Sequence, residues 1–357
     1  MAQQHLDPPT DPTAGLVSGD ALADYLRAQA TEFLRSLRQH RETGGASNGS
    51  EESVDAARAL RRSARRISGS LHTFRPLLEP DWSEGMRPEL AWLSGTLARE
   101  HAYAARLERL LGALNRLSGS SSLPAQTPSA VGNRSAGAEP GTPGPRTQPA
   151  GNLTVGAAKA GALLDRQLTL ARTRAHSAAL QALGSSRFHA VADSVAVLAS
   201  EVPLTPAATT TDLRPLAAAA QDRLTDAIAA LPLVTAGHPY NAEALVHGLS
   251  ADTAPQPQDA PWHQVRLLLR LHRYAREVLY GEECPTDVRL LAAGQALNRH
   301  RDAAEAASAA ASAARTPRIA PATAYALGVL HADQRHEVEA ARFAFQQAWQ
   351  MEAVRTP

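Results

Sequence analysis

Arginine side chains recur at helical spacing near the start of the chain. Five of them stand at i, i+3, i+4, i+7 and i+8, and they are Arg58, Arg61, Arg62, Arg65 and Arg66. At about 100° per residue, an α-helix gathers them within an arc of about 140°. Residues 56–78 contain six arginines and no acidic residue. Closely packed guanidinium groups repel one another, so this pattern predicts a surface that binds a polyanion.

A second basic stretch follows about 200 residues later. Its members stand at i, i+3, i+7 and i+10, and they are His263, Arg266, Arg270 and Arg273. No acid intervenes between residues 260 and 276. Two basic-faced helices, one in each half of the chain, suggest an internal duplication whose halves face each other. The ordinary alternative is a solvated helix face, with acids one turn away balancing the charge.

Apolar periodicity predicts the helices that carry these residues. In the first basic helix, leucine, isoleucine, alanine and phenylalanine fall on the side opposite the arginines. No alternating strand pattern and no short hairpin signal is present, so we expect an all-α fold. The other expected helices cover residues 19–40, 86–117, 153–198, 211–231, 262–280, 286–314 and 321–351.

Two segments have the composition of disordered chain. Residues 1–17 are punctuated by proline, and residues 118–152 are rich in serine, glycine, proline and alanine. We therefore expect one helical domain over residues 18–352. A tether at 118–152 would join a first half, 18–117, to a second half, 153–352.

The composition of the whole chain excludes several classes of protein. The formal net charge of the 357 residues is only +1, so the chain is not a uniformly basic protein that covers nucleic acid. The informative feature is that positive charge is concentrated in particular segments. A single cysteine, Cys284, cannot form an internal disulfide framework. No run approaches the ~18 apolar residues of a membrane span. The N-terminal residues lack a signal-peptide core. These features predict a cytoplasmic protein.

The order of the motifs resembles the CHAD family, the conserved-histidine α-helical domain. The matching stretches are Ala57–Arg66, Thr73–Leu78, Ser186–Phe188 and His263–Ala275, within a likeness that covers roughly residues 20–352. The resemblance implies two helical bundles related by a pseudo-twofold axis, with a basic groove or pore between them. It also implies binding of inorganic polyphosphate and association with polyphosphate granules.

The sequence departs from the family pattern at two places. Arg58 stands where the first half of the family has its histidine, and only the second half keeps that residue, as His263. The acidic residue expected after Leu97 is also missing, with His101 and Ala102 in its place. An arginine at the first position preserves positive charge and removes pH sensitivity there.

Together these observations predict a polyphosphate-binding surface without catalytic residues. Its candidate residues are Arg58, Arg61, Arg62, Arg65, Arg66, Arg75, Arg187, His263, Arg266, Arg270 and Arg273. We expect Asp302 to orient arginines and Tyr274 to be a packed aromatic residue. No phosphate-binding glycine loop, metal-binding motif or nucleophile motif is present, so we expect neither an enzyme nor a cofactor.

Two alternatives stay open. A nucleic-acid-binding protein also needs cations, but the near-neutral charge, few aromatic residues and lack of a helix-turn-helix pattern disfavour it. A scaffold that recruits a protein partner through the 118–152 tether is the other alternative.

Overall fold

The computed structural model describes residues 17–44, 51–119, 150–238 and 257–351, together with Val246 and Leu249. Within these ranges the regular structure is helical, and the only bridge between extended residues joins Leu78 to Leu204. The expected all-α class is therefore confirmed. The main helices are α1 (Gly19–Gly44), α2 (Glu51–Thr73), α3 (Pro80–Leu117), α4 (Ala150–Leu183), α5 (Ser186–Ser200), α6 (Arg214–Ala229), α7 (Leu233–Ala236), α9 (Ala260–Tyr280), α10 (Val288–Ala314) and α11 (Pro321–Trp349).

Local sequence signals explain where many of these helices begin. A proline occupies one of the first two positions of α3, α6, α9 and α11. Proline suits this place because the first backbone N–H groups of a helix have no partner within the helix. Ser185 caps α5 by accepting a hydrogen bond from the backbone N–H of Phe188, and Asp287 caps α10 in the same way through Leu290.

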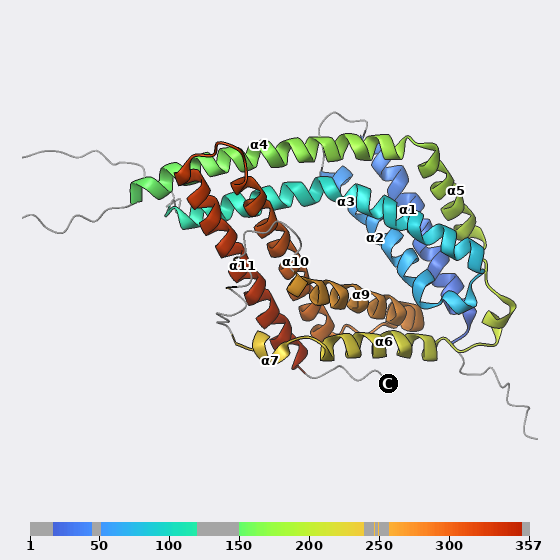
Figure 1. The fold of residues 1–357 in the computed structure, drawn as a ribbon. Helices are drawn as coiled ribbons and strands as arrows, with labels where there is room; N and C mark the ends of the chain where they lie inside the picture. The colour runs from blue at the N-terminus through green and yellow to red at the C-terminus, as the bar shows by residue number, and fades with distance from the viewer. Residues whose placement is uncertain are drawn as a thin grey trace, which may run out of the picture.

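The helices form a frame around the middle of the molecule. The two longest, α3 and α4, lie side by side along one edge (Figure 1). Helices α1, α2 and α5 pack at one end, α10 and α11 pack at the other, and α6 with α9 closes the opposite edge. As a result, α2, α3, α9 and α10 all face the middle of the frame.

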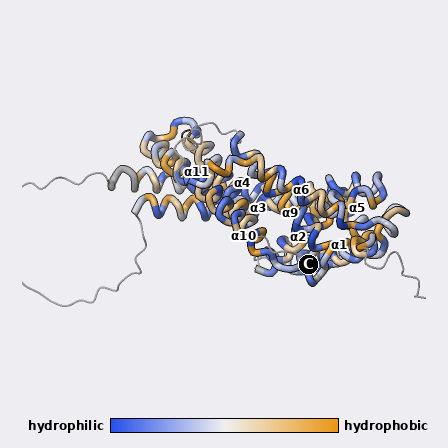
Figure 2. The backbone as a smooth tube through the Cα atoms, turned by 90° about the horizontal axis from the view of Figure 1, so that it is seen from below, coloured by the Kyte–Doolittle hydropathy of each residue, from blue (hydrophilic) through white to orange (hydrophobic). Residues whose placement is uncertain are grey.

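Three apolar clusters hold the frame together. The first joins α1, α2 and α5 to the first part of α3, the second joins α6, α9, α10 and α11, and the third joins the end of α3 to α4, α10 and α11. Hydrophobic and hydrophilic positions alternate along the helices (Figure 2), as expected for amphipathic helices that bury one side. The apolar side predicted for this helix is fully buried and comprises Leu60, Ala64, Ile67 and Leu71 of α2, with Phe74 directly after its end.

The packing connects the two predicted halves, 18–117 and 153–352. Helix α3 contributes Leu90 to the first cluster and Leu110 to the third, while α5, from the second half, packs against α1. At 38 residues α3 spans about 57 Å, so its two ends contribute to different clusters. Helix α3 ends at Leu117 as expected, and α4 begins at Ala150 rather than residue 153.

Other sequence predictions fall largely or wholly outside the described ranges. Residues 1–16 and 120–149, which include nearly all of the two predicted disordered segments, lie there. Among the helices that the structure does describe, none is long and apolar enough to cross a membrane.

Candidate anion-binding site

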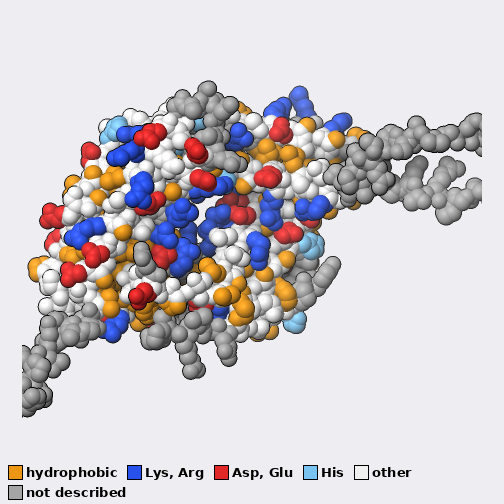
Figure 3. All heavy atoms as spheres, turned by 180° about the vertical axis from the view of Figure 1, so that it is seen from behind, with side chains coloured by type: hydrophobic (Ala, Val, Ile, Leu, Met, Phe, Trp, Pro, Cys, Tyr) orange, Lys and Arg blue, Asp and Glu red, His pale blue; other side chains and the backbone are white. Residues whose placement is uncertain are grey.

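A cleft of about 460 Å³ lies where α2, α3, α9 and α10 meet. We call it the arginine cleft, because its lining includes Arg61, Arg65, Arg87, Arg270 and Arg301, with His72 at one end. No acidic side chain belongs to this described lining. In Figure 3, Lys and Arg side chains gather around a hollow in the middle of the molecule. The cleft therefore concentrates positive charge on a protein whose net charge is nearly zero.

Burial of the apolar face of α2 directs arginines on its other face toward the cleft. Arg61, Arg65 and His72 are separated by four and seven residues and share one face of the helix. The opposite face is buried in the first apolar cluster, which fixes the rotation of α2. From the other side, α9 presents Leu267, Arg270 and Leu271 to the same space. The two basic helices predicted from the sequence thus do face each other.

The charged forms of the arginines in and beside the cleft are destabilised by their surroundings. Burial lowers the pKa of Arg61 to about 10, and the charges of Arg65 and Arg301 add to the effect. Burial likewise lowers the pKa of Arg266 to about 9, with further contributions from Arg270 and Arg301. Burial and neighbouring arginines also lower the pKa of Arg270. These shifts report burial first and repulsion between arginines second, and a bound anion would offset both.

Two guanidinium nitrogens in the cleft also lack hydrogen-bond partners. The Nε atoms of Arg61 and Arg65 are buried and bond to no atom of the described chain. Buried polar groups in proteins are nearly always hydrogen-bonded, and an orphaned donor is costly. A phosphate oxygen would satisfy such a donor and, being charged, would form one of the stronger kinds of hydrogen bond.

Acids from other helices neutralise several of the predicted residues. Arg66 donates to Glu277 of α9 from Nε at 2.8 Å and from Nη2 at 3.3 Å. Arg273 pairs with the same carboxylate at 3.4 Å. The arginine face of α2, which has no acid of its own within residues 56–78, is therefore balanced at this end by an acid of another helix. Glu277 is 211 residues away from Arg66 in sequence. A search for acids one helical turn before or after each arginine therefore does not find it.

The remaining arginines predicted in the first half lie outside the cleft lining. Arg58 pairs with Asp55 at 3.1 Å, and its Nη2 lies 3.2 Å from His101 Nε2. Arg75 pairs with Glu84 at 2.8 Å, and Arg62 is exposed.

Arg187 lies farther away, on α5. It bonds to Glu89 at 2.6 and 3.0 Å and stacks over Trp92, 4.1 Å from the ring centre. It lines a separate cavity of about 360 Å³ between α3 and α5. The structure therefore does not bring Arg187 together with the two basic helices.

His263 lines another cavity and does not belong to the lining of the arginine cleft. This cavity, of about 540 Å³, is also lined by Arg106, Asp259, Glu305 and Arg335, so its charge is mixed. The pKa of His263 is lowered by burial and by the arginines at 266 and 301, with Asp259 opposing the effect.

Arg266 lies near the arginine cleft without being part of its lining. Its Nε donates to Asn298 Oδ1 at 2.8 Å. The effects of Arg270, Arg301 and Arg65 on its pKa show that its charge is close to the cleft. Arg266 and His263 therefore extend the basic surface along α9.

Sequence reasoning missed two cationic members of the cleft, Arg301 and Arg87. Arg301 bonds to Asp302 and lies 3.9 Å from Glu305, so its local sequence looks balanced. Arg87 pairs with Glu84 at 3.0 Å, and its Nη2 lies 2.9 Å from Nδ1 of His72. Asp302 contacts Arg301, and its expected role in orienting arginines stays a prediction.

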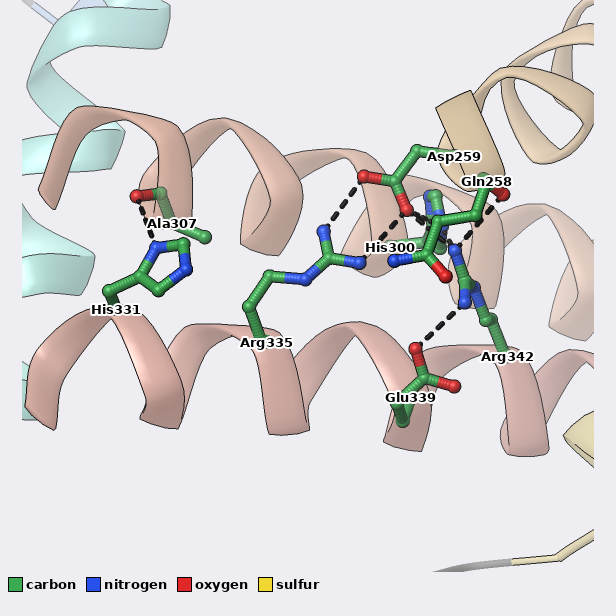
Figure 4. A network of polar contacts seen from close by, with 8 residues as sticks. All are labelled: Gln258, Asp259, His300, Ala307, His331, Arg335, Glu339 and Arg342. Atoms are coloured by element: carbon green, nitrogen blue, oxygen red, sulfur yellow. Dashed lines mark hydrogen bonds and ion pairs between the residues drawn. The ribbon is translucent and has the colours of Figure 1, made fainter. Parts of the chain in front are cut away.

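A buried ionic network fixes the beginning of α9 (Figure 4). Asp259 accepts hydrogen bonds from Arg335 at 2.8 and 3.2 Å and from Arg342 at 2.6 Å. His300 of α10 lies 3.5 Å from the same carboxylate. Burial alone would raise the pKa of Asp259, but hydrogen bonds from His300 and Arg335 hold it well below its usual range. One carboxylate thus ties α9 to α10 and α11.

The helical frame and the helices that carry the cleft define the class of protein. The CHAD domain family model matches residues 28–310, and the chain belongs to the CHAD family. Among solved structures, it is similar to PptA from Streptomyces chartreusis, with 70% sequence identity and a TM-score of 0.75. That match covers 94% of this chain and 99% of the other. No curated protein matched.

Proposed function

We propose that the protein binds inorganic polyphosphate, without catalysis, through the arginine cleft. The observation that carries the proposal is the convergence of Arg61, Arg65 and Arg270 on a space that no described acidic side chain lines. Membership of the CHAD family supports it, since the sequence resemblance implies that ligand. A granule rich in polyphosphate would then retain the protein by the same contacts.

The chemistry of the arginines in and beside the cleft suits binding more than reaction. Even with lowered pKa values of about 10 and 9, Arg61 and Arg266 stay protonated at neutral pH. A protonated guanidinium can hold a phosphate through several N–H donors, but it does not exchange protons with it. We therefore assign the arginines to charge neutralisation and hydrogen bonding.

Polyphosphate fits this lining better than nucleic acid does. Single-stranded nucleic acids gain much of their affinity from bases stacked on exposed aromatic side chains. Tyr274 is the one aromatic residue of the described lining, and only 3% of it is exposed. The described lining therefore has no exposed aromatic side chains on which successive bases could stack.

Titration with long-chain polyphosphate at rising salt tests the proposal. Each arginine–phosphate contact releases condensed counterions, so log K should fall with log[salt], with a slope on the order of −3 to −4 for four or five contacts. When duplex DNA competes at equal phosphate concentration, we expect the protein to stay bound to polyphosphate. Absence of binding at low salt, or affinity that salt does not change, would refute the proposal.

A further inference from the structure

Arg301 of α10 lines the arginine cleft among cations that come from other helices. Burial first, and then the charges of nearby arginines that include this one, lower the pKa values of Arg61, Arg266 and Arg270. On α10 itself, the Nε and Nη2 groups of Arg301 donate to Asp302. One acid therefore balances this arginine, and a second acid paired with it would make the local charge negative.

Glu305 is a candidate for that second acid, but it is held by α3. Arg301 and Glu305 are four residues apart on α10, the spacing at which side chains of one helix meet. The Oε1 atom of Glu305 nevertheless lies 3.9 Å from Nε of Arg301, outside the roughly 2.7–3.2 Å of a hydrogen bond. Its Oε2 atom accepts a hydrogen bond from Nη2 of Arg106. Arg106 thus competes with Arg301 for one carboxylate.

The surroundings of Arg106 fix its guanidinium in place. Only 17% of its side chain is exposed, against 43% for Glu305. The guanidinium also lies 5.5 Å from the ring centre of Tyr103, one turn earlier on α3. Arg106 and Glu305 both line the mixed-charge cavity beside His263, and neither belongs to the lining of the arginine cleft. An effect of Arg106 on a ligand in the cleft would therefore pass through Glu305.

We propose that Arg106 is a positioning residue for the arginine cleft, an inference that rests on the proposed function. By holding Glu305 toward α3, it leaves Arg301 paired with Asp302 alone, and the remaining N–H groups of that guanidinium can donate to a phosphate. Without Arg106, Glu305 would turn to Arg301, and two acids would then face the phosphate beside one arginine. Polyphosphate affinity thus depends on a residue outside the cleft.

Arg106→Gln tests this role in the full chain, with long-chain inorganic polyphosphate as the ligand. We expect affinity at low salt to fall about five- to tenfold, and the slope of log K against log[salt] to become shallower by about one, because one phosphate contact is lost. Circular dichroism and urea unfolding establish that the variant is folded. Arg106→Met keeps the apolar stem against Tyr103, and it takes the place of Arg106→Gln if that variant does not fold.

Neutralising Glu305 should remove the need for Arg106. In a Glu305→Gln protein no carboxylate at this position can turn to Arg301, so adding Arg106→Gln should change affinity by less than about twofold. This cycle separates positioning from a merely structural role. If Arg106 served only to link α3 to α10, Glu305→Gln would break the same link and would rescue nothing.

Arg109→Gln is the matched control. Arg109 also lies on α3, pairs with an acid of another helix, Glu337 of α11 at 3.5 Å, and does not line the arginine cleft. The substitution removes the same positive charge. We expect its polyphosphate affinity to stay within about twofold of the native value, because salt screens charges that are distant from the ligand.

The outcomes separate this inference from the proposed function. If the native protein binds polyphosphate and Arg106→Gln binds it equally well, the positioning role is wrong and the proposed function stands. An equal loss with and without Glu305→Gln would show that Arg106 acts on the ligand or the fold directly, which also overturns the inference. An equal loss in Arg109→Gln would reduce the effect to net charge. If the native protein binds no polyphosphate, both proposals fail together.

Discussion

Arg66 and Glu277 form a two-bonded ion pair that joins the two basic helices. The hydroxyl of Tyr25 donates to the same carboxylate at 2.8 Å, so three helices meet on one acid. Burial lowers the pKa of Arg66, but the hydrogen bond and charge of Glu277 outweigh it and the net shift is upward. Glu277 thus neutralises this end of the arginine row.

Replacing Glu277 with glutamine should strengthen polyanion binding and weaken the fold. The change frees Arg66 and Arg273 for phosphate, so we expect polyphosphate affinity to rise several-fold at low salt. The pair is only partly buried, with 27% and 19% of the two side chains exposed, so the loss of stability should be about 1–2 kcal/mol. Glu201→Gln makes the same charge change at an exposed position. A fall in affinity with Glu277→Gln alone would mean that this acid positions the arginines instead.

The double variant Arg61→Glu/Arg65→Glu should lose polyphosphate binding and keep its helices. Both side chains line the cleft, and the reversal places two acids where the ligand would lie. We expect at least a hundredfold loss, measured by titration, with unchanged circular dichroism. Arg172→Glu/Arg174→Glu, at exposed positions on α4, controls for net charge. If the cleft variant unfolds while the control does not, the two arginines are structural.

Binding should tighten modestly as pH falls from about 8 to 6. Burial and neighbouring arginines lower the pKa values of His263 and His72 below the usual 6.5, so both are mostly neutral at pH 7 in the free protein. A bound phosphate raises these pKa values, so the complex takes up protons and gains affinity as pH falls. His263→Gln should reduce the pH dependence and His263→Gln/His72→Gln should flatten it, each without abolishing binding. An unchanged profile in the double variant would show that neither imidazole responds to the ligand.

Asp259→Asn should be among the most destabilising single substitutions. It removes the negative charge shared by Arg335 and Arg342, which are 2% and 4% exposed, and leaves two buried cations less compensated. Breaking such a pair costs about 3–5 kcal/mol, measurable by urea unfolding. Asp222→Asn, at an exposed position on α6, should cost little. Comparable losses of unfolding free energy in both variants would show that the buried carboxylate stabilises the fold no more than an exposed one does.

The folded protein should also lose stability in mild acid. Burial lowers the pKa of His300 and of His272 to about 4, against 6.5 in an unfolded chain. The unfolded state therefore binds more protons between these values, and the unfolding free energy falls as pH drops from 6.5 toward 4. The loss is up to about 3 kcal/mol for each histidine. Chemical unfolding at pH 7 and pH 5 measures it, and equal stability at the two values would contradict the assignment.

Local periodicity was enough to predict the all-α class and the buried face of α2. These features depend on which residues share one side of a helix, and that follows from 3.6 residues per turn. Arg61, Arg65 and Arg270 were predicted for the same reason, since each lies opposite an apolar stripe that must be buried. The end of α3 at Leu117 was predicted because the composition changes there.

Tertiary structure alone decided which cations remain available to a ligand. Arg66 is balanced by Glu277, and Arg187 by Glu89, because separate helices dock together. Arg301 enters the cleft although it contacts two acids close by in sequence, Asp302 and Glu305. Charge balance is set by distances of a few ångströms, and those depend on docking between helices that can be 200 residues apart in the chain. The sequence therefore determined the basic faces of α2 and α9, and only the packing of the frame determined where their arginines meet in one cleft.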